Sequence, residues 1–307
     1  MDTTANPIRA ERFLRELKST LEPARGTYIY DARIRDALEK TSPHDSSGYV
    51  AWLQKLFGFL AEQISVSGRK TLDVGCGAGE LTVLMKCLGF DATGFDVHAE
   101  YIRLARILAA ENGFREEMFV CGRGSRLPFP DRSFDIVTMI SVVEHLDDAS
   151  LKRLIPELAR VCRGALYVQA PNSASIRDDH TGLLFVPWMP PWLARIYVAG
   201  RGPKYRYHIS ESGSWDVHYR GFDEVIAHFE PYFNCDLSPG ASSYPPTPED
   251  YSPTKIGKRF RISDREVFVG MQLPWRQFRI SRGHPREAYY PYLNLILTPK
   301  QRTCGEN

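Results

Sequence analysis

The sequence lacks the features that mark several large classes of protein. Its six cysteines include no CxxC pair and no zinc-ligand spacing, so we expect reduced thiols and predict no metal site. No internal repeat or low-complexity tract is present. The first thirty residues are rich in arginine and glutamate and contain no continuous apolar stretch, so no signal peptide is predicted. These absences favour a cytoplasmic protein.

The charges are nearly balanced. There are 39 lysines and arginines against 37 aspartates and glutamates, which gives a net charge of +2. This balance gives no reason to expect a nucleic-acid partner. The chain has 307 residues, of which 43% are hydrophobic, and that is enough for one large or two modest globular domains.

The hydrophobic period changes along the chain. Helical spacing predicts N-terminal helices over 7–22, 30–40 and 49–64. Beyond them, short apolar strands are predicted over 70–75, 91–97, 117–122, 134–141 and 165–171. The helices predicted between these strands cover 81–89, 99–113 and 148–164. The alternation predicts right-handed βαβ units around a parallel sheet, whose ligands bind at the carboxyl ends of the strands.

The alternation stops after residue 171. Residues 172–220 and 239–264 are rich in proline and aromatic residues. A further helix is predicted over 221–233, and closing strands over 265–273 and 292–299.

The stretch LDVGCGAGE, residues 72–80, has three glycines between two carboxylates. A strand, a glycine loop and a helix form a nucleotide-type site, and Asp96, which follows the next strand's apolar core, could bind both ribose hydroxyls. A dinucleotide fingerprint would need a third glycine at position 80, which is Glu80. Because Asp73 and Glu80 would repel a pyrophosphate, the loop favours a ligand with ribose hydroxyls and positive charge, such as S-adenosylmethionine. The alternative is that Glu80 only caps the helix and faces water.

Four stretches in this order resemble class I S-adenosylmethionine-dependent methyltransferases. They are LDVGCGAGELT, GFDVHAEYIRLAR, LPFPDRSFDIVTMISVVEHLDD and APN, and the resemblance returns weakly at 221–233 and 292–299. It implies an α/β fold with a Rossmann-like seven-stranded sheet, a reversed last strand, an N-terminal helical cap, and insertions after strand 5 and before the last strand. The implied division is a cap over 1–45, an S-adenosylmethionine-binding core over 46–171, an acceptor-binding insertion over 172–220, and the C-terminal part of the core over 221–307.

The resemblance also assigns cofactor contacts. It implies that Gly75, Gly77 and Gly79 surround the methionine end, which Asp73 supports, and that Asp96 binds the ribose. Val97 and Ser141, the last residues of two predicted strands, are further candidates.

Members of this family usually carry an aspartate where the segment GRGSRLPF has Arg123. Arginine cannot accept a hydrogen bond. The adenine must then be bound by Ser125, by backbone groups, or by stacking on Arg123.

The stretch DDHTGLLFVPWMPPWLARIY, residues 178–197, is the candidate acceptor wall. It is similar to methyltransferases of polysaccharide and lipopolysaccharide biosynthesis. Carboxylates and an imidazole next to aromatic planes suit a polyhydroxylated ring, and the residues concerned are Asp178, Asp179, His180, Phe185, Trp188 and Trp192. A packed lid with an ordinary core is the alternative. Methylation of a nucleobase amine is disfavoured, because the family's Asn/Asp-Pro-Pro-aromatic turn is replaced by SVVEH at 141–145.

These residues predict O-methylation of a small-molecule or glycan acceptor. His180 would be the general base, oriented by Asp178 or Asp179, with His145 as its rival. Tyr28 and Tyr30 of the cap are expected to border the acceptor.

Other functions remain open. The alternatives are a C- or N-methyltransferase of a terpenoid, quinone or amine, and a non-catalytic S-adenosylmethionine-binding protein. Membrane contact through residues 182–200 is expected only if the acceptor is lipid-linked. The sequence does not determine the oligomeric state.

Overall fold

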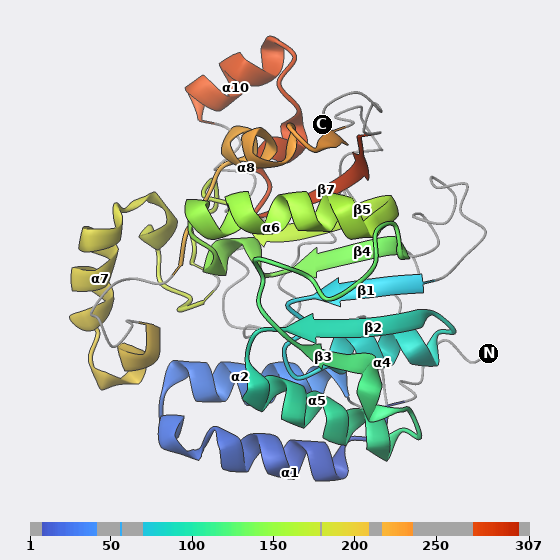
Figure 1. Ribbon diagram of the computed structural model, residues 1–307. Coiled ribbons are helices and arrows are strands. Elements are labelled where there is room, and N and C mark those ends of the chain that lie inside the picture. Colours follow the sequence, from blue (N-terminus) through green and yellow to red (C-terminus); the bar gives the residue numbers. More distant parts are fainter. Residues whose placement is uncertain are drawn as a thin grey trace.

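Residues 8–41, 56, 70–178, 180–208, 217–235 and 273–300 are described in the computed structural model of the chain. Their strands form one seven-stranded sheet in the order β3-β2-β1-β4-β5-β7-β6 (Figure 1). The strands are β1 Lys70–Val74, β2 Asp91–Asp96, β3 Phe119–Cys121, β4 Phe134–Ile140, β5 Cys162–Pro171, β6 Phe233–Cys235 and β7 Tyr292–Pro299. β7 is antiparallel to both of its neighbours, whereas β1 to β5 are parallel. The predicted seven-stranded α/β sheet with a reversed last strand is confirmed.

The helices are α1 Glu11–Thr20, α2 Tyr28–Lys40, α4 Glu80–Cys87, α5 Ala99–Glu111, α6 Asp148–Val161, α7 Pro191–Ala199, α8 Phe222–Phe229 and α10 Pro274–Ser281. Helices α6 and α8 cover one face of the sheet, and α4 and α5 cover the other, whereas α7 stands beyond its carboxyl edge (Figure 1). Leu72 and Val137 are buried in one core with side chains of α6 and α8. Ala92 and Tyr167 are buried in a second core with side chains of α4 and α5. The two cores follow from the alternating directions of side chains along a strand.

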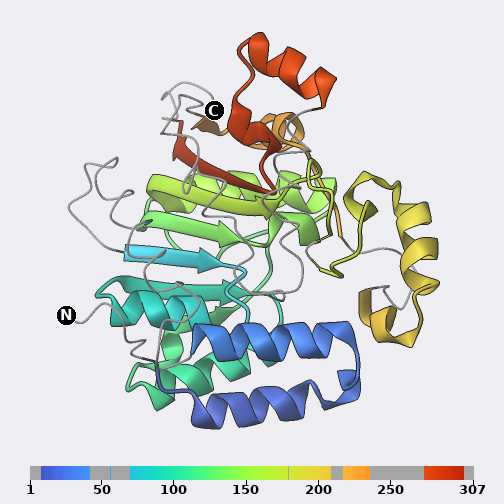
Figure 2. The same ribbon diagram turned by 180° about the vertical axis from the view of Figure 1, so that it is seen from behind.

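The N-terminal helices lie next to α5, on the β3 side of the sheet (Figures 1 and 2). The side chain of Ala10 cannot cap α1, and the Glu111 carboxylate of α5 does so instead. It accepts hydrogen bonds from the backbone N–H groups of Arg12 at 2.9 Å and Phe13 at 3.1 Å. A carboxylate at a helix N-terminus satisfies unpaired donors and complements the helix dipole. The helix predicted over 49–64 falls outside the described residues except for Leu56, which is helical and buried.

Two predicted helix ends were wrong. α6 ends at Val161, and residues 162–164 already belong to β5, where Cys162 pairs with Phe134. α8 ends at Phe229, close before Pro231, which has no N–H to continue the helical hydrogen bonds. The chain then forms β6 beside β7, a strand that was not predicted. The strand predicted over 265–273 lies outside the described residues except for Leu273.

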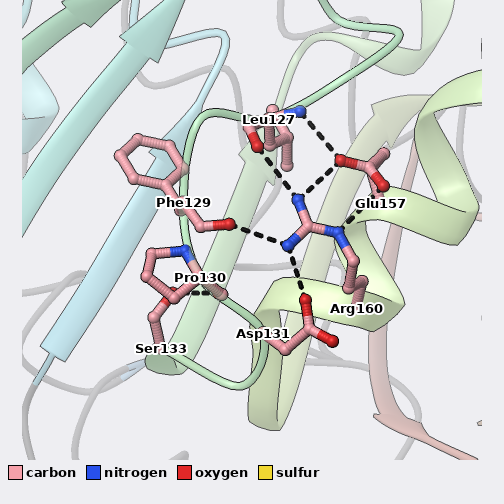
Figure 3. Close-up of polar contacts among 7 residues, drawn as sticks. All are labelled: Leu127, Phe129, Pro130, Asp131, Ser133, Glu157 and Arg160. Carbon is pink, nitrogen blue, oxygen red and sulfur yellow. Dashed lines mark hydrogen bonds and ion pairs between the residues drawn. The ribbon is translucent and has the colours of Figure 1, made fainter.

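One arginine fixes the loop between β3 and β4 (Figure 3). The Arg160 guanidinium of α6 donates to the carbonyls of Leu127 at 2.9 Å and Phe129 at 2.7 Å, and to the Asp131 carboxylate at 2.8 Å. Glu157 pairs with Arg160 at 2.7 Å and accepts the Leu127 N–H at 2.9 Å. These bonds fix the path of the loop as it leads into the start of β4.

Candidate active site

The glycine loop between β1 and α4 needs its glycines for two reasons. Gly75, Gly77 and Gly79 have φ angles of 74°, 53° and 86°, in the left-handed region that other residues rarely adopt. A Cβ atom on Gly75 would lie 2.4 Å from Val142 Cγ2, and one on Gly79 would lie 2.7 Å from Ala105 Cβ. Gly77 has no atom within 4 Å of a built Cβ. Space next to its backbone is therefore available to a ligand.

Two buried aspartates lie at the ends of the neighbouring strands β1 and β2. Asp73 accepts hydrogen bonds from the hydroxyls of Thr82 at 2.6 Å and Thr138 at 2.9 Å. Burial raises the pKa of Asp73 to about 6, although these hydroxyls act to lower it. Asp96 accepts the Gly77 N–H at 3.0 Å through Oδ2 and the His98 N–H at 2.9 Å through Oδ1. Asp96 thus links the glycine loop to the end of β2.

Glu80 begins α4 and is 4% exposed, so the alternative in which it faces water is wrong. Its carboxylate accepts a 2.6 Å charge-assisted hydrogen bond from Arg33 of α2. Because Arg33 compensates its charge, Glu80 repels an anion less than the sequence argument assumed. Arg33 is not predicted from the sequence, since forty-seven positions separate the pair along the chain.

The remaining predicted cofactor contacts lie on the same edge of the sheet. Val97 follows β2 and is 51% exposed, and Ser141 follows β4 and is also exposed. Ser125 is exposed in the turn after β3, where Arg123 and Arg126 form a short antiparallel bridge. Because β2, β1 and β4 are neighbours, the fold brings the aspartates, the loop and these residues to one edge.

The predicted base and its rival lie together. The rings of His145 and His180 are perpendicular, with centroids 5.1 Å apart. Neighbouring protein atoms desolvate the charged form of His145, and His180 and His218 oppose it, so the pKa of His145 falls to about 4 although part of the ring is solvent-exposed. Glu144 is buried next to them, and ligand atoms of the three side chains lie within 4.8 Å of one another.

A carboxylate and two imidazoles are a donor set that can hold a divalent transition metal. No metal site was predicted, because these residues show no clustered ligand spacing and His180 lies far along the chain from Glu144.

A tyrosine that the sequence did not predict links Asp178 to His180. The Tyr219 hydroxyl donates a short hydrogen bond to Asp178 Oδ1 and lies 3.0 Å from His180 Nδ1. Asp178 Oδ1 itself is 3.8 Å from Nδ1, beyond hydrogen-bonding distance. Asp178 is fully buried and also accepts the N–H and the hydroxyl of Thr181. Asp179 lies outside the described residues.

The direction of these bonds sets the histidine tautomer. An ionised Asp178 can only accept, so the Tyr219 proton is directed to it. The Tyr219 oxygen must then accept from His180, which places a proton on Nδ1. The other ring nitrogen, Nε2, keeps a lone pair that can take a proton from a ligand.

Arg220 holds the turn that carries His145. It is 4% exposed, and its guanidinium donates to the carbonyls of Val143 at 3.0 Å and Leu146 at 2.7 Å and to the Asp148 carboxylate at 2.8 Å. The N–H of His218 also donates to the Glu144 carbonyl at 2.7 Å. Residues 217–220 therefore position both histidines: Tyr219 positions His180, and Arg220 positions His145.

Three aromatic residues predicted to contact the acceptor are exposed. Phe185, Trp188 and Trp192 are 48%, 45% and 65% exposed, so they do not belong to the small buried core that the insertion forms around Val186 and Val198. The Phe185 and Trp188 ring centroids lie 5.7 Å apart. Figure 1 shows α7, which contains Trp192, beyond the arrowheads of β1, β2 and β4, so the insertion stands at the ligand edge.

The N-terminal cap reaches this insertion through Tyr28. Its ring stacks on Tyr205 at a centroid distance of 5.7 Å, and a Cβ built on Gly182 would lie 3.3 Å from the Tyr28 hydroxyl. Tyr30 is half-buried in the first turn of α2, where its N–H binds the capping hydroxyl of Thr27. Among the described residues, Tyr30 makes no hydrogen bond or ring contact with the insertion.

Comparison with known proteins identifies the domain. Residues 72–167 match a family described as a methyltransferase domain. The chain carries a class I S-adenosylmethionine-dependent methyltransferase domain. The match begins one residue before Asp73 and ends inside β5, so it contains the glycine loop, both aspartates and His145.

Relatives of this methyltransferase domain act at different atoms. The ubiquinone biosynthesis O-methyltransferase of Bordetella avium is 34% identical over 97 residues, which are 32% of this chain and 38% of that protein. The sterol 24-C-methyltransferase of Gibberella zeae is 35% identical over 108 residues, 34% of this chain and 28% of that protein. The matches thus span less than half of either relative. The PH0226 protein of Pyrococcus horikoshii is 18% identical, with a TM-score of 0.47, over 83% of this chain and 92% of that one.

Within the described residues, no helix combines the length and the apolar character that crossing a membrane requires.

Proposed function

We propose that the protein transfers the methyl group of S-adenosylmethionine to a hydroxyl of a small-molecule or glycan acceptor. The observation that carries this proposal is the Asp178–Tyr219–His180 chain of hydrogen bonds, which leaves a basic nitrogen at the ligand edge. A neutral amine acceptor may be methylated without a base, whereas a hydroxyl needs one. The name of the Bordetella relative, an O-methyltransferase, agrees with this choice, and the sterol relative supports the alternative of a carbon acceptor.

The loop geometry fits the cofactor. The space beside Gly77 lets a ligand approach the backbone of the loop closely, and the Asp96 carboxylate lies at the same turn. Asp96 would accept hydrogen bonds from the ribose hydroxyls, and the negative charge of Asp73 would favour the ammonium end. When bound, the cofactor supplies a methyl group on a cationic sulfur that a nucleophile can displace.

The protein's part in the reaction is to orient the acceptor and to move one proton. His180 Nε2 takes the hydroxyl proton as the oxygen attacks, and the imidazolium keeps its Nδ1 proton on Tyr219. Asp178 stabilises that positive charge through the same hydrogen bonds. His145 is a weaker base near neutral pH, because its pKa is about 4. The exposed planes of Phe185 and Trp188 would bind the acceptor ring.

Tyr219→Phe is the sharpest test, because it keeps the ring and removes the oxygen that links Asp178 to His180. Release of S-adenosylhomocysteine would be measured with panels of hydroxylated acceptors, amines and carbon nucleophiles. With the accepted substrate, we expect His180→Ala to lower kcat by roughly 10²–10⁴, the usual contribution of a general base, and Tyr219→Phe to lower it by about tenfold. Affinity for S-adenosylhomocysteine should not change in either variant.

The matched control is Tyr232→Phe before β6, which removes the hydroxyl of an exposed tyrosine outside this group and should keep the wild-type kcat. Turnover only with amines, or a His180→Ala enzyme of normal kcat, would contradict the proposal. Loss of activity in a chelator, restored by a divalent cation, would instead assign Glu144, His145 and His180 to a metal.

A further inference from the structure

A cavity lies at the carboxyl edge of the sheet, on the β7 side. Its volume is about 480 Å³, within the range of small-molecule sites. Asn172 after β5, Phe222 of α8, Arg276 of α10 and Tyr289 before β7 line it, together with Trp188 of the insertion. Because β5 ends where β7 begins, with Pro171 paired to Tyr292, the cavity is on the edge that carries the glycine loop. Of these residues, only Trp188 was predicted as an acceptor contact.

A buried arginine forms part of the cavity wall. Arg276 is 3% exposed, and its guanidinium carbon lies 5.0 Å from the ring centre of Trp275 and 5.4 Å from that of Tyr289. Its Nη2 donates to the Ala174 carbonyl at 3.0 Å. Burial lowers the pKa of Arg276, which means that the fold holds this cation where charge is costly. An anion in the cavity would stabilise it, and a guanidinium matches the two oxygens of a carboxylate or phosphate.

A tyrosine offers a second donor in the same cavity. The Tyr289 hydroxyl is buried, and although the Arg279 guanidinium lies close enough to donate to its oxygen, the hydroxyl proton has no acceptor among the described residues. Burial raises the pKa of this hydroxyl, against the opposing effect of the nearby Arg279 cation, so it keeps its proton at neutral pH. A buried donor without an acceptor is costly, and a ligand oxygen would satisfy it.

The acidic residues of the cavity are already paired with cations. Asp223 forms an ion pair with Arg279 at 2.7 Å and a hydrogen bond with His284 at 2.9 Å. Glu224 lies 3.8 Å from Arg220. Their charges are therefore compensated, and they oppose an anion beside Arg276 only weakly.

We propose that this cavity binds a carboxylate or phosphate group carried by the methyl acceptor, with Arg276 and Tyr289 as its donors. The aromatic rings of Trp275 and Trp188 would contact the ring or chain that bears the acid. The reference to an acceptor rests on the proposed function, whereas the anion site itself does not.

Binding of benzoate and of its neutral amide, benzamide, tests the site in the full chain. Calorimetry should give at least about tenfold tighter binding of benzoate, since a charge-assisted bond is lost in the amide. Arg276→Gln and Tyr289→Phe should each weaken the binding of benzoate by about tenfold and leave the affinity for S-adenosylhomocysteine unchanged. Tyr289→Phe keeps the ring and serves if Arg276→Gln fails to fold. The matched control is Arg282→Gln at the end of α10, whose guanidinium stacks on Phe278 and does not line the cavity.

Equal binding of benzoate and benzamide, or an equal loss of benzoate binding in Arg282→Gln, would overturn the anion site. If inorganic phosphate binds to the wild type and needs Arg276, and benzoate does not bind, the cavity is a site for a free anion. That result would overturn the assignment to the acceptor. In turnover, 4-hydroxybenzoate should be preferred to 4-hydroxybenzamide, and Arg276→Gln should remove that preference. If neither is methylated, the binding experiment still decides the site, so failure of the proposed function is recognised separately.

Discussion

Replacing Arg33 by methionine would leave the Glu80 carboxylate buried without its cation. In the folded chain their side chains are 20% and 5% exposed, and the N–O distance is 2.6 Å. Methionine has similar length and keeps the apolar contacts of the arginine stem. The substitution therefore isolates the charge, and α2 loses its bond to the helix that follows the glycine loop.

Arg33→Met should lower the free energy of unfolding by a large amount for a single residue near the surface. Removing one partner of a buried ion pair costs about 3–5 kcal/mol, because the remaining charge is uncompensated. Arg33 is one-fifth exposed and can be replaced partly by water, so we expect about 3 kcal/mol. Arg33→Met/Glu80→Gln removes both charges and should return the free energy of unfolding to within about 1 kcal/mol of wild type. The double variant is thus more stable than Arg33→Met alone.

Urea unfolding followed by tryptophan fluorescence measures these differences. The matched control is Arg25→Met, which breaks an exposed arginine–glutamate pair with Glu22 at 3.1 Å and should not change the stability measurably. An Arg33→Met variant as stable as wild type would refute the reasoning. So would a double variant that is less stable than Arg33→Met, because the loss would then come from packing.

Two further predictions concern the aspartates. Asp96→Ala should weaken the binding of S-adenosylhomocysteine at least about tenfold in calorimetry, and unchanged affinity would contradict the ribose role of Asp96. Because Asp96 also binds the Gly77 N–H, the substitution should lower the free energy of unfolding by about 1–3 kcal/mol. Asp73 has a folded pKa of about 6 against an ordinary 3.8, so the folded state binds its proton more tightly. The contribution of Asp73 to the free energy of unfolding is complete below pH 3.8 and is lost as pH rises through about 6, a change of about 3 kcal/mol. Asp73→Asn should abolish this pH dependence when unfolding is measured as a function of pH.

The cofactor half of the site could be predicted because its signals are local. Positive φ angles and close backbone packing require glycine at Gly75 and Gly79, so the spacing itself contains the geometry. Asp73 and Asp96 end neighbouring strands, and the topology of parallel strands brings such ends together. β6 was not predicted, because three residues, Phe233–Cys235, are too few to show a strand period.

The acceptor half could be predicted only in part, because its contacts join distant segments. His180 and His145 were both candidates, but nothing in the sequence shows that their rings meet. Tyr219 was missed because a tyrosine in a Pro- and aromatic-rich insertion has no local pattern that directs its hydroxyl to Asp178. Arg220 was missed for the same reason, since the carbonyls that it binds lie seventy-four and seventy-seven positions away.

One helix connects the two halves. Tyr28 and Arg33 are both on α2; the first stacks on Tyr205 of the insertion, and the second binds Glu80 after the glycine loop. Five residues of α-helix span only about 7.5 Å, and a helix of this length moves as a rigid element. A displacement of α2 must therefore change the contacts on both sides together.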